Sequence, residues 1–337
     1  MPFSIVILVI GLLLGITTLI GIFGNFAVCL AVSWNKSLRT QLSLFLVNLA
    51  ISDIGMSASC MPFAVATVLF HKQQIGELFC YFNGFINTFF SLASVLTITT
   101  ICIFQYISIV MPLERMITNF RCLLMLIGVW ILSGFLATGP IAYWGRYEFT
   151  SNIFNCDYYH SNQKSEMSYA IALMFVGFAF PLAIMIFSYA NIFIALRKHN
   201  SRMTRTTSIS SVPAEGAVVS AGTKIRITVL LIFLTFIVCR TPFFVYLVFV
   251  VAEPSLPVDF LSQLSFWAIY LHSACNPFIF TFKHSEYQDT LKDIYSTCKV
   301  VVVKCCSNAE EGQKEEHAQG SKTAEPVKAG TEQAKQE

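Results

Sequence analysis

Long stretches without any charged side chain alternate with short polar connections along this chain. Residues 41–70 contain one charged residue, Asp53, and residues 227–252 contain one, Arg240. A helix needs roughly 20 mostly apolar residues to cross a bilayer, and each stretch is long enough. The pattern therefore predicts an all-α membrane protein, a bundle of seven transmembrane helices. The expected spans are 4–34, 41–70, 78–112, 121–144, 167–197, 224–252 and 260–282.

Two further segments follow the last expected span. Residues 283–297 place Tyr287 and Ile294 at helical spacing among polar residues, which predicts a short amphipathic helix along the inner membrane face. This helix would complete one membrane-embedded domain of residues 1–297. Residues 298–337 are rich in Glu, Gln, Lys and Ala and have little to bury, so we expect a disordered cytoplasmic tail.

Lysine and arginine are unevenly divided between the two sides of the expected bundle. The connections 34–41, 114–121 and 197–226 hold ten of them, whereas the connections on the other side hold three. Short basic loops stay in the cytoplasm, so we expect the N-terminus outside the plasma membrane and the C-terminus inside. The first charge-free stretch is too long for a signal-peptide core and is expected to be a span itself. Because this asymmetry accounts for the net charge of +3, we infer no nucleic-acid binding.

The eleven cysteines divide by their expected location. Cys80 and Cys156 are the only two on the outer side, an oxidising compartment, which predicts a disulfide between them. Cys298, Cys305 and Cys306 follow the amphipathic segment and are candidate palmitoylation sites, the alternative being free cytosolic thiols. The other six lie in or at the ends of spans, where we expect them to pack as small apolar side chains.

One marker in each expected span, in the expected order, resembles the rhodopsin-like G-protein-coupled receptors. The markers are Asn25 in GNFAV, Asp53 in LAISD, Cys80, Trp130, Pro181 and Tyr189 in FPLAIMIFSY, Pro242, and Asn276 with Pro277 in NPFIF. The stretch GRYEF…NCDYY…FPLAIMIFSY is also similar to the opsin branch. The resemblance covers roughly residues 4–297. It implies a receptor without cofactor or enzymatic activity, whose outer half binds a ligand and whose inner half engages a heterotrimeric G protein and arrestin.

The resemblance also implies roles for individual residues. Those that match the family's buried sodium site are Asp53, Ser94, Ser273 and Asn276. Those that match the family's ligand pocket are Asn87, Thr88, Ser91, Phe243, Phe244, Trp267 and Tyr270. Those that match its G-protein-coupling and switch positions are Val95, Phe104, Gln105, Tyr106, Pro181, Tyr189, Phe236, Pro242, Pro277 and Phe280.

The end of the third span departs from the family pattern. Where the family has an acid, an arginine and a tyrosine, this chain has Phe104, Gln105 and Tyr106, and the second acidic position falls at Gly222. The ion pair that holds the inner half closed in the family is therefore missing. Two interpretations follow. The receptor couples in an unconventional way, or it has lost coupling and acts as a ligand sink or as the dimer partner of a competent receptor.

Arg240 stands where the family has a pivoting tryptophan. A guanidinium at mid-membrane costs about 2.5–3.5 kcal/mol on the insertion scale, so we expect it to face the bundle interior. It would replace sodium as a tethered cation for Asp53, or bind an anionic ligand group, or be satisfied by backbone carbonyls and water. His272, where the family usually has asparagine, is expected beside it.

Two residue types that the family uses to bind particular ligands are absent from the matching positions of this chain, which narrows the class of ligand. Asn87 stands where amine receptors have an aspartate, which argues against a conventional monoamine. Tyr270 stands where opsins have the lysine that binds retinal, so no Schiff base can form there. A small polar molecule, a peptide, a lipid or a non-covalently bound retinoid remains. In the 197–226 connection, Arg205 precedes Ser208 by three residues, which suits phosphorylation of Ser208 by a basophilic kinase and arrestin-type regulation; the alternative is a Ser/Thr-rich loop that is only solvated.

Overall fold

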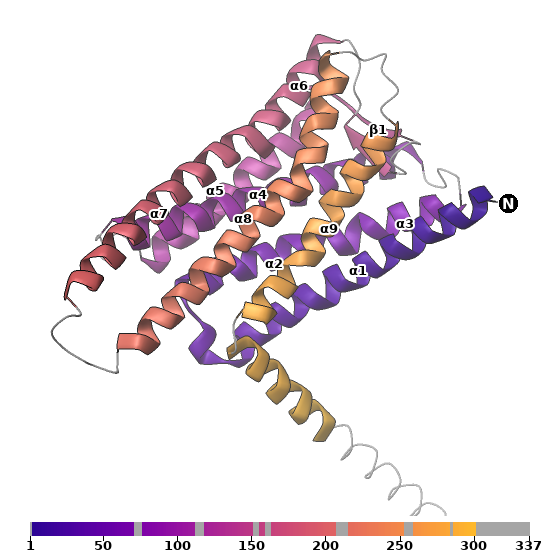
Figure 1. Cartoon of the computed structure of the whole chain (residues 1–337). Helices are drawn as coiled ribbons and strands as arrows, with labels where there is room; N and C mark the ends of the chain where they lie inside the picture. The colour runs from indigo at the N-terminus through magenta and orange to yellow at the C-terminus, as the bar shows by residue number, and fades with distance from the viewer. Residues whose placement is uncertain are drawn as a thin grey trace, which may run out of the picture. The chain divides into compact units, whose positions relative to one another are not determined.

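The structure, a computed structural model, describes residues 2–70, 76–111, 118–150, 155–158, 163–206, 215–252, 259–283 and 286–300. A first compact unit ends at Gln288 and contains a bundle of helices and one small sheet (Figure 1). Its helices are α1 (Pro2–Trp34), η1 (Lys36–Leu38), α2 (Gln41–Ser59), α3 (Met61–Phe70), α4 (Glu77–Val110), α5 (Asn119–Thr138), η3 (Gly139–Ala142), α6 (Lys164–Met174), η4 (Phe175–Ala179), α7 (Phe180–Thr206), α8 (Glu215–Ala252) and α9 (Asp259–Lys283). Its strands are β1 (Tyr147–Thr150) and β2 (Asn155–Tyr158).

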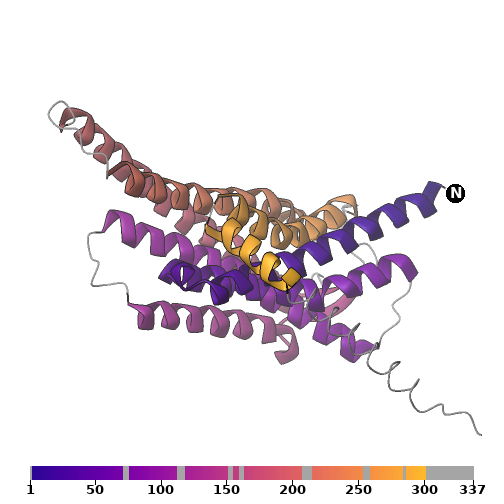
Figure 2. The ribbon, with the colours of Figure 1, turned by 90° about the horizontal axis from the view of Figure 1, so that it is seen from below.

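Helix α4 lies at the centre of the bundle. It packs against α2, α5, α7 and, more lightly, α8, while α1 packs against α2 and α9, and α8 packs along α9 (Figure 2). Because α4 meets helices on several sides, side chains around most of its circumference are buried. Small polar residues on α4 can therefore reach partners on several neighbouring helices.

Six helical stretches among the described residues are long and apolar enough to cross a membrane. Their outward faces carry large apolar side chains, such as Phe23, Phe135 and Val238, which are 65%, 69% and 70% exposed. Such surfaces need a lipid covering. Helix α9 is not among these stretches; it carries several polar residues, and two of them, His272 and Ser273, are buried inside the bundle. The six stretches are Leu8–Trp34, Gln41–Leu69, Glu77–Val110, Asn119–Ala142, Lys164–Ala195 and Ile227–Phe249.

Two expected spans are interrupted rather than continuous helices. The span predicted at 41–70 breaks into α2 and α3 at Cys60, and Pro62 lies in the first turn of α3, where its missing N–H is tolerated. The span predicted at 167–197 contains the π-helical turn η4 between α6 and α7. Such turns widen a helix locally and occur often at functional sites.

Several polar groups within the bundle hydrogen-bond to neighbouring helices, which lowers the cost of burying them away from water. The Asn25 amide donates to the carbonyl oxygens of Gly21 and of Ser273, which joins α1 to α9. The Trp130 indole N–H donates to Asn48. Close packing depends on small residues: a Cβ at Gly24 would lie 2.9 Å from the Pro277 side chain.

Strands β1 and β2 form an antiparallel hairpin in which Phe149 is opposite Cys156. The predicted disulfide is confirmed: Cys80, in the first turn of α4, is bonded to Cys156 in β2. We call this end of the bundle the hairpin end and the other the opposite end. After the bundle, residues 286–300 form the predicted short C-terminal helix. Its placement along a membrane face stays a prediction.

Candidate functional site

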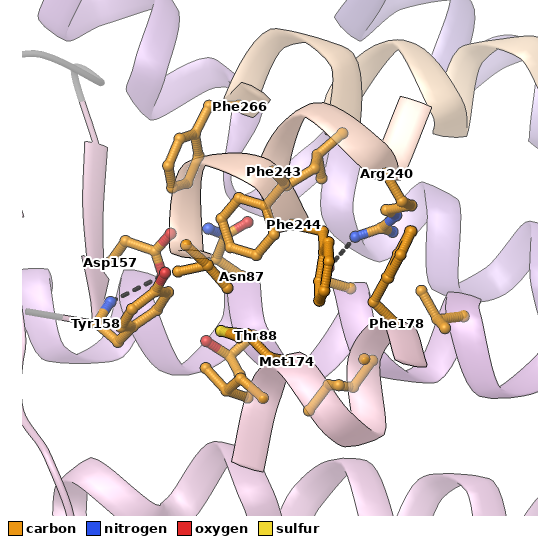
Figure 3. Close-up of a pocket in the computed structure, with 17 residues that line it drawn as sticks. Asn87, Thr88, Asp157, Tyr158, Met174, Phe178, Arg240, Phe243, Phe244 and Phe266 are labelled. Carbon is orange, nitrogen blue, oxygen red and sulfur yellow. Dashed lines mark hydrogen bonds between the residues drawn. The ribbon is translucent and has the colours of Figure 1, made fainter. Parts of the chain in front are cut away.

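A cavity of about 60 Å³ lies within the bundle towards the hairpin end. Residues of α4, β2, α6, η4, α8 and α9 line it (Figure 3). About 10–15 Å³ of such space holds one water, so the cavity accepts a compact group of a few heavy atoms. Six residues predicted for ligand contact line it: Asn87, Thr88, Ser91, Arg240, Phe243 and Phe244.

Arg240 is 5% exposed and forms part of the cavity wall. Its Nη1 donates to the Ser91 hydroxyl oxygen over 2.6 Å (Figure 3). Its Nε and Nη2 have no hydrogen-bond partner among the described residues. A buried cation with two unused donor nitrogens carries a desolvation cost that an anion in the cavity would offset.

Asp53 is fully buried and is held by two donors. Ser94 donates to one carboxyl oxygen over 3.1 Å, and the Asn276 amide donates to the other over 2.7 Å. Ser273 also faces this carboxyl group. The Asn276 acyl oxygen has no donor among the described residues. The four residues expected at a sodium site are thus brought together, and this set of oxygen atoms suits a small hard cation.

One of the three alternatives for Arg240, a direct ion pair with Asp53, is absent from the ion pairs of the described residues. The geometry gives the reason: Ser94 and Asn276 already occupy the Asp53 oxygens, and Ser91 draws the guanidinium towards the cavity. The two groups still interact electrostatically. His272 also interacts electrostatically with Arg240, and neither of its ring nitrogens has a hydrogen-bond partner in the described chain.

The hairpin contributes two cavity residues that the sequence analysis did not identify, Asp157 and Tyr158. Asp157 is 5% exposed, and one of its carboxyl oxygens accepts the Tyr158 backbone N–H over 2.8 Å. Burial raises the pKa of Asp157 to about 7, although this hydrogen bond opposes the shift. The available signal was its position next to Cys156, since the bridge fixes that part of the chain to α4.

Two residues predicted for ligand contact do not line the cavity. Tyr270 is 2% exposed and packs in an apolar cluster with Met56 and Met61, and Trp267 borders the same cluster. The Tyr270 hydroxyl instead accepts a hydrogen bond of 2.6 Å from the Asn155 amide. This contact ties β2 to α9, so Tyr270 holds the hairpin in place.

A row of aromatic rings runs from the cavity into the bundle. Phe178 of η4 lines the cavity and stacks on Phe244, with 4.5 Å between the ring centroids. On its other side Phe178 stacks on Phe236 at 5.8 Å. Phe236 is fully buried, and the fully buried Val95 lies on the cavity wall. Of these residues, Phe244 occupies a position predicted for ligand contact, and Phe236 and Val95 occupy predicted switch positions.

The remaining predicted switch residues are not among those that line the cavity. Phe104 contacts Phe45, Tyr106 contacts Phe187, and Tyr189 stacks on Phe233. Gln105 and Phe280 are buried, Pro181 lies early in α7, and Pro242 and Pro277 lie inside α8 and α9. Cys298 is exposed, whereas Ser208, Cys305 and Cys306 lie outside the described residues.

Comparison with known proteins agrees with this architecture. Residues 24–280 match the family described as 7 transmembrane receptor (rhodopsin family). Rhodopsin, GQ-coupled, of Mizuhopecten yessoensis is 30% identical over 291 residues, which is 84% of this chain but only 58% of that protein. Rhodopsin of Enteroctopus dofleini is 26% identical over 91% of this chain and 70% of its own length. A crystal structure of squid rhodopsin superposes with a TM-score of 0.79 at 25% identity, covering 90% of this chain and 88% of that one.

Proposed function

Because the chain belongs to the rhodopsin family of seven-transmembrane receptors, we propose that it is a receptor for a small anionic ligand. The acidic group of the ligand pairs with Arg240 in the cavity at the hairpin end. The observation that carries this proposal is the unpartnered Nε and Nη2 of Arg240 on the cavity wall. Binding an anion there replaces the water that the buried guanidinium lost.

The charge distribution supports an outward-facing cavity. The connections at the opposite end hold ten lysines and arginines against three at the hairpin end, and basic loops remain in the cytoplasm. A disulfide at the hairpin end also suits an oxidising compartment. In this proposal the receptor lies in the plasma membrane with the cavity in its extracellular half and its opposite end facing the cytoplasm, where a G protein binds.

The aromatic row supports a route for the signal. Phe178 touches the cavity on η4 and stacks on Phe236, which lies deeper on α8. A ligand that shifts Phe178 or Phe244 therefore displaces packed rings on two helices. Closely packed interiors respond to such shifts by changing between discrete arrangements.

The anionic-ligand proposal is tested by a screen of small carboxylates, phosphates and sulfonates for G-protein and arrestin responses in cells. An active acid should lose at least about tenfold in potency in Arg240→Gln, since a hydrogen bond to a charged group contributes about 1.5–3 kcal/mol. Arg121→Gln, which removes an equal charge at the exposed start of α5, should leave the potency unchanged. Equal potency in the wild type and Arg240→Gln would refute the proposal.

Whether the receptor signals by itself depends on Gln105, buried near the end of α4. The missing arginine leaves two outcomes, unconventional coupling or a ligand sink that dimerises with a competent receptor. Gln105→Arg separates them. If the wild type binds the acid but only the Gln105→Arg variant activates a G protein, the receptor is a ligand sink. If the wild type activates a G protein as strongly as the variant, the receptor signals by itself.

A non-covalently bound retinoid is the second candidate, because the similar proteins named above are rhodopsins. Tyr270 provides no amine for a Schiff base, and it lies outside the cavity lining. The cavity of about 60 Å³ is also small for a retinoid. A retinal absorbance band that stays with the purified protein after unbound retinal has been removed would favour this candidate over the acid.

A further inference from the structure

The cavity has a second polar end, formed by the hairpin and the neighbouring turn of α4. Asp157 and Tyr158 project into it from β2, and Asn87 projects from α4 (Figure 3). The exposed fractions of the three residues are 5%, 8% and 5%. The Tyr158 hydroxyl and the Asn87 acyl oxygen have no hydrogen-bond partner among the described residues. Three buried oxygen-bearing groups therefore face one end of the cavity.

This end is separated from Arg240 by an apolar middle. The side chains between the two ends include Phe243, Phe244 and Met174 (Figure 3). Ser91, which binds Arg240, lies one helical turn from Asn87, so the two ends are displaced by about 6 Å along α4. The cavity thus has a cationic end, a short apolar section and an end rich in acceptors.

The acceptor end is fixed in place by the fold. The disulfide ties Cys156 to the start of α4, and the Asn155 amide binds the Tyr270 hydroxyl on α9. Asp157 follows these two anchored residues directly. Its carboxyl group is therefore held at the cavity by two independent attachments, as a binding group needs to be.

We propose that the cavity selects a compact ligand with an acidic group at one end and an ammonium group at the other, joined by a short hydrocarbon segment. This proposal rests on the proposed function for the Arg240 end and adds the opposite end. An ammonium group has three N–H donors and no acceptor. The carboxyl group of Asp157, the Asn87 acyl oxygen and the Tyr158 hydroxyl supply three acceptors for it.

Charge balance points to the same ligand class. A purely anionic ligand would satisfy Arg240 but would leave Asp157 buried without a cation. A purely cationic ligand would satisfy Asp157 but would leave Arg240 buried without an anion. A buried charge without a partner is costly, so a ligand that carries both charges satisfies both ends together.

The test uses straight-chain ω-amino acids from β-alanine to ε-aminocaproate, each matched with the alkanoate and the alkylamine of the same length. Affinities are measured on the full-length receptor in lipid nanodiscs by ligand-induced thermal stabilisation. The best-fitting ω-amino acid should bind the wild type at least about tenfold more tightly than its matched alkanoate, as expected for one charged hydrogen bond. The matched alkylamine should bind more weakly than both.

Two variants separate this proposal from the proposed function. Asp157→Asn should abolish the preference for the ω-amino acid while alkanoate binding persists, whereas Arg240→Gln should abolish the binding of both. If the wild type binds the two compounds equally, or if Asp157→Asn keeps the preference, the proposed ammonium end is wrong while the anion site stands. If no compound of the series stabilises the wild type, both proposals fail. The wild-type comparison needs no variant, so a misfolded Asp157→Asn would not prevent the test.

Discussion

Arg240 shows how a single side chain defines the chemistry of the cavity. Helix α8 brings its guanidinium to the cavity wall, where Ser91 accepts from one nitrogen while the other two remain without partners in the described chain. Asp53, on α2, is held separately by Ser94 and Asn276. The arginine thus influences Asp53 through its charge, without contact, and keeps its hydrogen bonds for the cavity.

We predict that the sodium response of the receptor depends on the charge at Arg240. A cation nearby reduces the need for sodium at Asp53, since charges interact strongly in the bundle interior. Sodium should therefore raise the Tm of the Arg240→Gln variant by about 1–2 °C, equivalent to roughly 1 kcal/mol, and should not raise the Tm of the wild type. Thermal unfolding in sodium chloride and in choline chloride measures this. A full sodium effect in the wild type would contradict the expectation.

The affinity for an ω-amino acid should depend on pH through Asp157. Burial raises its pKa to about 7, so the carboxyl group is mostly ionised at pH 8 and mostly neutral at pH 6. Only the ionised form pairs with an ammonium group, so the affinity should fall by about tenfold from pH 8 to pH 6. Among the described residues, the titratable groups that interact with Asp157 are Cys60, Tyr147, Tyr158, Tyr169 and Tyr270, and none of these is a carboxyl or imidazole group.

Thermal stabilisation at several pH values checks this dependence. Asp157→Asn should bind the same ligand with little change between pH 8 and pH 6, and the matched alkanoate should show no loss in the wild type. A wild-type affinity for the amino acid that stays constant over this range would exclude Asp157 as the group that binds the ammonium.

At this scale, the sequence predicts residue positions better than side-chain directions. Asn87, Ser91 and Arg240 line the cavity, and helical spacing and family markers locate them in the sequence. Whether Arg240 faced Asp53 or the cavity depended on its hydrogen bond with Ser91, which no sequence pattern reports. Asp157 was missed because its place depends on the course of a loop fixed by a disulfide and a hydrogen bond to Tyr270.

At the scale of the elements, the π-helical turn η4 connects the cavity to the packing of α7 and α8. It presents Phe178 between Phe244 and Phe236. The sequence predicts one continuous helix here, because a π-turn preserves the apolar pattern and leaves no marker in it. The break at Cys60 was also missed, although Pro62 was a usable signal.

Removing one ring of this row should uncouple binding from signalling. Phe236 is fully buried and does not line the cavity, so Phe236→Ala should change ligand affinity by less than about threefold but lower the maximal response. The cavity left behind should also destabilise the receptor by about 3–5 kcal/mol. Phe135→Ala, on an outward face and 69% exposed, is the matched control and should affect neither property.

Binding assays and thermal unfolding on the two phenylalanine variants measure these effects. If Phe236→Ala lost affinity and response in proportion, the ring would support the cavity and would not relay the signal. A normal response in the destabilised variant would also exclude the aromatic row as the route.

At the scale of the whole molecule, the arrangement of seven helices follows from the charge-free stretches. Each is long enough to span a bilayer, and polar residues within them, such as Asn25 and Asp53, bind partners inside the bundle. The fold class was therefore predictable from the sequence. The cavity was not, because its volume depends on how α4, α8 and the hairpin pack together.

The central claim is that an outward-facing anion site is built around Arg240 within this bundle. It is tested most directly by calorimetric titration of short alkanoates into the purified receptor in nanodiscs, with Arg240→Gln and Arg121→Gln in parallel. We predict saturable binding to the wild type and to Arg121→Gln, and a loss of at least about tenfold in affinity in Arg240→Gln. Binding of equal affinity to all three proteins, or to none of them, would contradict the claim.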